Sequence, residues 1–372
     1  MRERPGLRDF VVCVRCAASL DLNEAPLRCT RCGQEYGFVG SIPVLVARAD
    51  DHLNLWRQQL TMLKAQGHHT LSAIEEELET PGLLATSQAR LRALGAALRD
   101  QLSDITELVE PALGGDPPSG EGDGLPRGVV EYIQFLYRDW AWEGAGNREN
   151  LQALAAVRQV MSDAPLGRML VIGAGACRLA YDLHRECGAT ETAVVDIDPF
   201  LFVFAEAVIR GRTVSLTEST ANVQELAQVA KPWNLTAPAG PLRTEAFHFF
   251  LANGLAPPFE DGSFDTVVTP WFIDQVPTDL PAFLQTLHRQ IAPGGRWLNS
   301  GPLLYPPDAG LARRFSREEV FELAERAGFK IERWATESRM HLESPLNGRA
   351  KTEWVLSFEA SRNEAPPAPR TQ

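Results

Sequence analysis

A glycine turn and an acid, one strand apart, are the residues most able to do chemistry in this sequence. The apolar run Met169 to Ile172 breaks into Gly173-Ala174-Gly175, and the next apolar run, Ala193 to Val195, ends at Asp196. Glycines at such a turn let a ligand approach the backbone, and an acid at the tip of the following strand can accept hydrogen bonds from both ribose hydroxyls. The pattern therefore predicts a nucleoside site.

The residues around the turn indicate which nucleoside fits. A dinucleotide-binding turn has a third glycine three residues after the second, and Arg178 occupies that position here. The chain also has no Gly-Lys-Ser/Thr sequence, so a phosphate-binding loop of the P-loop type is absent. A site with an acid for the ribose and no site for phosphate suits S-adenosylmethionine, which has no phosphate and carries a sulfonium and a free amino acid end.

Two Cys-x-x-Cys pairs near the start of the chain have the spacing of metal ligands. Cys13 and Cys16 form one pair, and Cys29 and Cys32 form the other. Two such knuckles close a tetrahedral site, and four sulfur ligands leave no open position, so the spacing predicts a structural Zn²⁺. Iron in a rubredoxin-like site is the alternative. A segment this small needs the metal for its folding energy.

Strands and helices alternate from Met169 onward, so we predict an α/β fold with a doubly wound, mostly parallel sheet. We expect a zinc ribbon over 1–48, a helical connector over 49–113, and a linker rich in Pro and Gly over 114–127. The α/β domain should span 128–361, with a disordered tail over 362–372. Ligands bind at the carboxyl ends of parallel strands, which places Gly173, Asp196, Asn253 and Asp274 along one rim.

Composition limits the class of protein. The chain has 372 residues, 44% of them hydrophobic and 23% charged, which is ordinary for a globular protein. Its net charge of -12 makes nucleic acid an unlikely partner, although it leaves room for a local basic patch. No apolar run approaches the roughly 18 residues of a membrane span. Cysteines grouped for metal binding favour a reducing compartment, so we expect a cytoplasmic protein.

Longer motifs carry resemblances to known families. Residues 10–47 resemble the small zinc-ribbon activator that partners several RNA and protein methyltransferases. Residues 168–300 resemble class I S-adenosylmethionine-dependent methyltransferases, which implies their seven-stranded sheet. The segments R-D-W-x-x-E-G, T-P-W-F-I-D-Q-V and P-G-G-R-W-L-N-S-G-P-L-L-Y are similar to the carnosine N-methyltransferase family over roughly residues 130–360. Where that family has a histidine after G-P-L-L-Y this chain has Pro306, and His341 lies where the family has acceptor-loop tyrosines.

The resemblance implies roles for residues of this chain. It assigns Arg138, with Gln134, to the cofactor, and it places Asp274 in the acceptor pocket, where a carboxylate can orient an acceptor nitrogen or take its proton. Packing of the Arg138 segment as a simple aromatic lid is an equal alternative. We predict catalytic or pocket roles for Asp274, Tyr305 and His341. The full set of expected cofactor contacts is Gln134, Arg138, Gly173, Ala174, Gly175, Asp196, Ile197, Asn253, Gly254 and Thr269.

The sequence thus predicts an S-adenosylmethionine-dependent methyltransferase that acts on nitrogen in a small amino-acid or peptide derivative. An RNA or protein methyltransferase, with the ribbon as a built-in activator or docking module, is the first alternative. A scaffold that binds the cofactor without catalysis is the second. The ribbon also leaves room for a protein partner.

Overall fold

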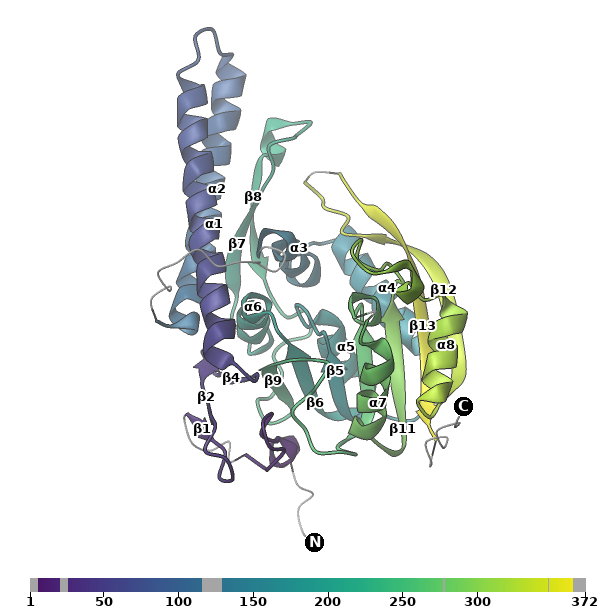
Figure 1. Cartoon of the computed structure of the whole chain (residues 1–372). Coiled ribbons are helices and arrows are strands. Elements are labelled where there is room, and N and C mark those ends of the chain that lie inside the picture. Colours follow the sequence, from purple (N-terminus) through teal and green to yellow (C-terminus); the bar gives the residue numbers. More distant parts are fainter. Residues whose placement is uncertain (1–5, 21–25, 116–128, 277, 347, 364–372) are drawn as a thin grey trace.

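The computed structural model describes residues 6–20, 26–115, 129–276, 278–346 and 348–363. The predicted linker therefore falls, apart from Gly114 and Gly115, outside the described residues, and so does the predicted tail after Asn363. In chain order the fold comprises a small ribbon, a long helical hairpin and an α/β domain (Figure 1).

One sheet of nine strands organises the described chain, and it confirms the predicted α/β class. Five neighbouring strands, β11, β10, β5, β6 and β9, run parallel, and β13 enters antiparallel between β11 and β12. The inner strands are buried along nearly their whole length, as expected for a parallel sheet covered on both faces. The order across the sheet is β12 (Phe329–His341), β13 (Lys351–Arg362), β11 (Ile291–Gly301), β10 (Phe264–Pro270), β5 (Gly167–Ile172), β6 (Ala189–Asp196), β9 (Phe247–Ala252), β4 (Ile42–Leu45) and β3 (Phe38–Val39).

The two strands beyond the predicted seven belong to the ribbon. β4 pairs in parallel with β9, and the register places Val44 opposite Leu251 and Leu45 opposite Ala252. This pairing covers the edge of the α/β sheet, where unpaired backbone groups would otherwise invite association with another chain. The ribbon is therefore part of the main sheet. Its other elements are η1 (Leu7–Phe10), β1 (Leu27–Arg28) and β2 (Glu35–Tyr36).

Helices cover both faces of the sheet, and each face has its own hydrophobic cluster. The ribbon also packs into the second cluster, beside the strands that α7 and α8 cover. The helices of the first face are α3 (Val129–Trp140), α4 (Ala145–Val160), α5 (Arg178–Glu186) and α6 (Pro199–Ile209), and those of the second are α7 (Leu280–Gln290) and α8 (Arg317–Arg326). Short 3-10 turns complete the chain: η2 (Leu226–Gln228), η3 (Ile273–Gln275) and η4 (Leu311–Arg313).

The predicted helical connector is a hairpin of α1 (Ala49–Leu78) and α2 (Ala85–Leu113) that extends well beyond the sheet (Figure 1). Its base packs on the start of α6, where the Trp56 and Phe200 rings lie 5.4 Å apart. Nearby, His52 Nε2 lies 2.9 Å from the carbonyl oxygen of Ile197. The connector therefore touches the strand end that carries Asp196.

A second hairpin, β7 (Val214–Ser219) and β8 (Ala230–Leu235), was not expected from the sequence. Its buried Glu218 accepts hydrogen bonds from the indoles of Trp142 and Trp233, both at 2.8 Å, and from the hydroxyl of Ser344 at 3.0 Å. Three donors from distant segments thus satisfy one buried carboxylate. Among the residues that the structure describes, no helix combines the length and apolar character that a membrane span requires.

We predict that Trp56→Ala destabilises the protein by about 3–5 kcal/mol, because it removes a side chain that is 5% exposed and leaves a cavity against Phe200. Differential scanning calorimetry measures the effect as a lower unfolding midpoint. Met62→Ala, at a side chain 51% exposed on the same helix, should stay within about 0.5 kcal/mol. Equal shifts for the two variants would mean that the connector does not stabilise the α/β domain.

Candidate functional site

The turn between β5 and α5 takes a backbone shape that suits close contact with a ligand. Gly173 has φ +72° and Gly175 has φ +54°, in the region that favours glycine. A Cβ at Gly173 would lie 2.6 Å from the ring of Phe272, so no side chain fits there. A Cβ at Gly175 would meet nothing within 4 Å. The space above Gly175 is therefore open, as a bound cofactor requires.

Asp196 ends β6 and closes the turn. Its carboxylate accepts a hydrogen bond from the backbone N–H of Gly175 at 2.8 Å and from that of Asp198 at 3.1 Å. Burial raises the pKa of Asp196, although these backbone donors act in the opposite direction. Ile197, the next residue, is 50% exposed. The predicted ribose acid thus lies against the predicted glycine turn, and Ala174 lies between the two glycines.

The segment Arg138-Asp139-Trp140 at the end of α3 is attached directly to this turn. The Trp140 indole donates to the carbonyl of Ala176 at 2.9 Å, and Arg178 donates to the carbonyl of Asp139 at 2.7 Å. Arg138 itself forms ion pairs with Asp139 at 2.6 Å and with Glu149 at 3.3 Å. The lid interpretation therefore holds for Trp140, while the Arg138 guanidinium already has two carboxylates. Gln134 lies exposed on the same helix.

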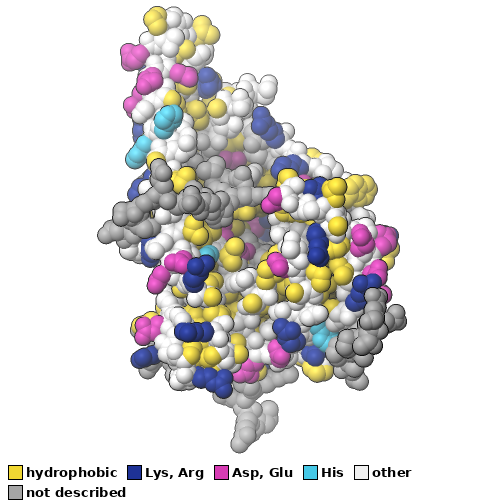
Figure 2. Space-filling view, viewed as in Figure 1, with side chains coloured by type: hydrophobic (Ala, Val, Ile, Leu, Met, Phe, Trp, Pro, Cys, Tyr) yellow, Lys and Arg dark blue, Asp and Glu magenta, His cyan; other side chains and the backbone are white. Residues whose placement is uncertain are grey.

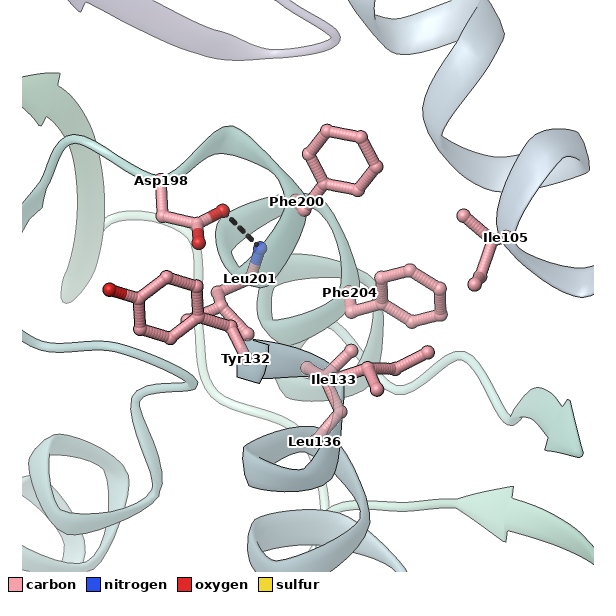
Figure 3. A pocket seen from close by; sticks show the side chains of 8 residues that line it. All are labelled: Ile105, Tyr132, Ile133, Leu136, Asp198, Phe200, Leu201 and Phe204. Atoms are coloured by element: carbon pink, nitrogen blue, oxygen red, sulfur yellow. Dashed lines mark hydrogen bonds between the residues drawn. The ribbon is translucent and has the colours of Figure 1, made fainter. Parts of the chain in front are cut away.

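An apolar pocket lies between α2, α3 and α6 (Figure 3). Asp198, two residues after the predicted ribose acid, lies at this pocket and caps α6 by accepting a hydrogen bond from the backbone N–H of Leu201 at 3.0 Å. Burial, with the nearby charge of Asp196, raises the pKa of Asp198 to about 7. The lining residues are Ile105, Tyr132, Ile133, Leu136, Asp198, Phe200, Leu201 and Phe204.

The residues predicted at the ends of β9 and β10 differ in what they can contact. The Asn253 side chain is exposed and accepts a hydrogen bond from the backbone N–H of Leu255 at 3.0 Å. Gly254 is buried, and a Cβ there would lie 2.6 Å from Ile172. Thr269 is fully buried, donating to Asn299 at 2.9 Å and accepting from the Trp297 indole at 2.7 Å. The Thr269 hydroxyl therefore acts inside the sheet, and its predicted cofactor contact receives no support.

Asp274 lies in η3, immediately after β10, and is 1% exposed. One carboxyl oxygen accepts a hydrogen bond from the Gln275 amide at 3.2 Å, and the other has no hydrogen-bond partner among the described residues. Burial raises the pKa of Asp274 to about 7. Tyr305 lies close enough for the Asp274 charge to contribute to a raised pKa, but its hydroxyl donates to the carbonyl of Phe315 at 2.9 Å. Asp274 thus offers a ligand a buried acceptor atom.

His341 lies near Asp274 because its ring packs against that of Trp271, three residues before Asp274. The two rings stack with centroids 4.3 Å apart and planes 22° from parallel. His341 Nδ1 also lies 3.0 Å from Glu149, whose other oxygen accepts from the backbone N–H of Leu342 at 2.9 Å. Burial alone would raise the pKa of Glu149, but the contacts with His341 and Arg138 lower it. An ion-pair network therefore connects the predicted cofactor residue Arg138 with the predicted pocket residue His341.

Backbone strain marks the same positions. The non-glycine residues with positive φ in the described part of the chain are Ala17, Cys177, Trp271 and Leu342. Cys177 is the N-cap of α5 at the glycine turn, Trp271 follows β10, Leu342 follows β12, and Ala17 directly follows the first Cys-x-x-Cys pair. Such conformations cost on the order of 1–3 kcal/mol each and concentrate at functional sites.

The four predicted metal ligands converge. The sulfur atoms of Cys13, Cys16, Cys29 and Cys32 all lie within 4.8 Å of one another. The Cys13–Cys32 and Cys16–Cys29 sulfur distances are 3.6 Å and 3.5 Å, close to the roughly 3.8 Å that tetrahedral Zn–S bonds of about 2.3 Å would give. The Tyr36 hydroxyl lies 3.1 Å from the sulfur of Cys13. The donor set therefore fits a four-sulfur metal site.

Glu149, Trp271 and Arg339 belong to this region and were not singled out from the sequence. Each makes its contacts to segments far away in the chain, such as Glu149 to residues about 190 positions later. One feature of the sequence could have indicated Trp271, because it lies inside the motif T-P-W-F-I-D, three residues before the predicted Asp274.

Comparisons with known proteins indicate the family to which the chain belongs. The sequence profile of the family described as carnosine N-methyltransferase matches residues 127–346. A carnosine N-methyltransferase of Dictyostelium discoideum is 26% identical over 193 residues, 46% of this chain and 41% of the relative. The Drosophila melanogaster carnosine N-methyltransferase named unmet is 28% identical over 269 residues, 66% of this chain and 58% of the relative. The chain spans about half the length of these curated relatives.

A solved structure of an S-adenosylmethionine-dependent methyltransferase from Methanosarcina mazei aligns with this chain at a TM-score of 0.38 and 16% identity, covering 56% of this chain and 96% of that one.

We predict that Asp274→Asn stabilises the protein at alkaline pH. Burial moves the Asp274 pKa from 3.8 to about 7 in the folded state, so the folded state holds its proton more tightly than the unfolded state. The stability associated with the protonated carboxyl is complete below about pH 4 and is lost as the pH rises through 7, by at most about 4 kcal/mol.

Unfolding midpoints of the two proteins should therefore agree near pH 4, diverge as the pH rises from about 4 to about 7, and keep a constant difference above that, with the asparagine variant higher. Asp198 is present in both proteins, so its own titration cancels in the difference. Asp279→Asn, at an exposed carboxylate of the following loop, is the matched control. A difference that does not depend on pH would contradict the burial of an ionisable Asp274.

Proposed function

Since this chain belongs to the carnosine N-methyltransferase family, we propose that it transfers a methyl group from S-adenosylmethionine to a nitrogen of a small amine- or imidazole-containing acceptor. The observation that carries this proposal is the buried, unpartnered oxygen of Asp274 on the same rim as the glycine turn and Asp196.

The described residues fit the cofactor. Gly175 leaves open space above the turn, and Asp196 has a carboxylate oriented by the backbone N–H of Gly175 for the ribose hydroxyls. When bound, S-adenosylmethionine supplies an electrophilic methyl group on a sulfonium. Trp140 holds the end of α3 against the turn through Ala176, so this helix forms one wall of the cofactor site. Ile197 would contact the nucleoside from its exposed position.

In this proposal Asp274 orients the acceptor by receiving a hydrogen bond from its N–H. A nitrogen must present a neutral lone pair for an in-line displacement, and an N–H on the acceptor can donate to the unpartnered Asp274 oxygen. Because its pKa is raised to about 7, the carboxyl can take up or release this proton near neutral pH. Trp271 and His341 would place aromatic surface beside the acceptor and exclude water. Tyr305 would support the pocket from the η3 side.

The identity of the acceptor follows the family only in part. The curated relatives are named for carnosine, and Pro306 and His341 are two positions where this chain departs from the family pattern. We therefore expect an acceptor with the same chemical class of nitrogen and a different outline.

The four-cysteine site is best explained as a structural zinc site of the ribbon, which joins the main sheet through β4. The Val12 N–H donates to the Pro258 carbonyl at 2.8 Å, and the Glu260 N–H donates to the Phe10 carbonyl at 2.9 Å. The ribbon thereby holds the loop that begins at Asn253. This supports a role as an integrated stabilising module, comparable to a built-in activator. Basic and acidic side chains are interspersed on the face shown in Figure 2, so that face gives no support to the RNA alternative.

We predict that the purified protein binds S-adenosylmethionine and that Asp196→Ala weakens binding at least about 10-fold, because a charge-assisted hydrogen bond to the ribose is lost. Isothermal titration calorimetry measures this, and transfer of a labelled methyl group to carnosine, histidine and related imidazoles tests the activity. Asp274→Asn should keep cofactor binding and reduce transfer. Normal binding in the Asp196→Ala protein would refute the assigned ribose contact, and absence of binding by the folded protein would refute the proposed function.

We predict one zinc ion per chain by elemental analysis. Cys29→Ser should lower zinc content and the unfolding midpoint, because a structural site contributes binding energy to folding. Cys187→Ser, outside the four-sulfur cluster, is the control and should retain the metal. Iron in place of zinc in protein produced without metal bias would overturn the choice of metal.

A further inference from the structure

Arg339 is an anomaly among the buried arginines of this protein. Arg178, Arg296 and Arg339 are each no more than 8% exposed. A guanidinium carries five N–H donors, and leaving them without partners in the interior is costly. The three residues differ in how far the chain itself satisfies them.

Two of these arginines are well satisfied. Arg178 donates to both oxygens of Asp182 and to the carbonyl of Asp139. Arg296 reaches Thr266, Ser162 and Glu359 and two backbone carbonyls. Both therefore have structural roles that use most of their donors.

The guanidinium of Arg339 has fewer of its N–H donors satisfied. Among the described residues, its guanidinium donates one hydrogen bond, to the Ser300 hydroxyl at 3.4 Å, and its Nε has no hydrogen-bond partner. Glu337 lies 3.1 Å from that Nε, without the alignment of a hydrogen bond. The Glu337 side chain is 42% exposed, so its carboxylate can rotate into solvent and keep its hydration. The carboxylate of a ligand could therefore take the place of Glu337 beside this guanidinium.

The position of Arg339 places it at the acceptor region. Ser300 lies at the carboxyl end of β11, and its carbonyl accepts the N–H of Trp271 at 3.0 Å. His341, stacked on Trp271, is two residues further along β12 and so on the same face as Arg339. On the neighbouring strand β13, Glu353 lies opposite Arg339, and its charge contributes to the raised pKa of Asp274. Arg339 therefore lies beside the segments that carry Trp271 and His341, and Glu353 connects it with Asp274.

Apart from Glu353 on β13, the charges near Arg339 have partners of their own. Glu149 is held by Arg138 and His341, and Arg138 is held by Glu149 and Asp139. Only Glu337 competes for the free donors of Arg339 among the ion pairs described.

From this geometry we propose that Arg339 is a specificity-determining residue that binds a carboxylate on the methyl acceptor. The inference rests on the proposed function and adds to it the recognition of the end of the acceptor opposite its reacting nitrogen. The acceptor carboxylate displaces Glu337 and receives the unpartnered Nε–H of Arg339 in a charge-assisted hydrogen bond. Asp274 meanwhile receives the N–H of the reacting group. The acceptor is thus fixed at two points and oriented for transfer.

The test compares carnosine with carnosine amide, in which the terminal carboxylate is an uncharged amide. Steady-state methyl transfer is measured with the full chain and with Arg339→Met, Glu337→Gln and Arg333→Met. We expect Arg339→Met to raise KM for carnosine roughly 10- to 100-fold with little change in kcat, and to leave KM for the amide unchanged. Glu337→Gln should lower KM for carnosine, because the competing carboxylate is removed. Arg333, exposed on the same strand, should be neutral.

The opposite effects of the two variants distinguish binding from structure. If Arg339 and Glu337 only stabilise each other, both variants will lower activity toward both compounds and lower the unfolding midpoint. That result, or equal kcat/KM of the unchanged protein for carnosine and its amide, would overturn the role of Arg339 and leave the proposed function standing. Transfer to neither compound, nor to histidine and related imidazoles, by protein that binds S-adenosylmethionine would overturn the proposed function for imidazole acceptors and this inference with it.

Discussion

The turn from β5 into α5 is the constraint on which the rest of this site depends. The backbone of this turn has positive φ at Gly173 and Gly175, where glycine adopts it readily, and at Cys177, where it is unfavourable. The surrounding structure fixes it: Val195 accepts the Gly173 N–H at 2.9 Å, and Asp196 accepts that of Gly175 at 2.8 Å. The same contacts that hold the turn also place Asp196 beside it. The local folding of this turn therefore also sets the geometry proposed for cofactor binding.

The ribbon stabilises the same end of the sheet through its contacts with β9. By pairing β4 with β9 it covers an exposed strand, and by bonding to Pro258 it holds the loop that starts at Asn253. The connector that follows places His52 against the carbonyl of Ile197. Elements before residue 80 thus reach two of the strand ends that form the rim. A metal site in the ribbon would therefore stabilise the cofactor region without touching it.

On the proposed acceptor side, the described residues leave some polar groups poorly satisfied. Among these residues, one buried oxygen of Asp274 has no hydrogen-bond partner, Arg339 has one long hydrogen bond beside its ion pair with Glu337, and Trp271 has a strained backbone. Their presence together at the ends of β10, β11 and β12 agrees with the expected trade between stability and function at a binding site.

Patterns that are local in the chain could be read from the sequence alone: the glycine turn with Asp196, the two cysteine pairs, the alternation that predicts a parallel sheet and the cap at Asp198. These depend on backbone preferences within a few residues. The tertiary structure decided what lies between distant segments. It extended the sheet with the ribbon, buried Glu218 under an unforeseen hairpin, enclosed Thr269 between Asn299 and Trp297, and brought Glu149 to His341. Such contacts depend on which side chains meet after folding, and no spacing in the sequence records them.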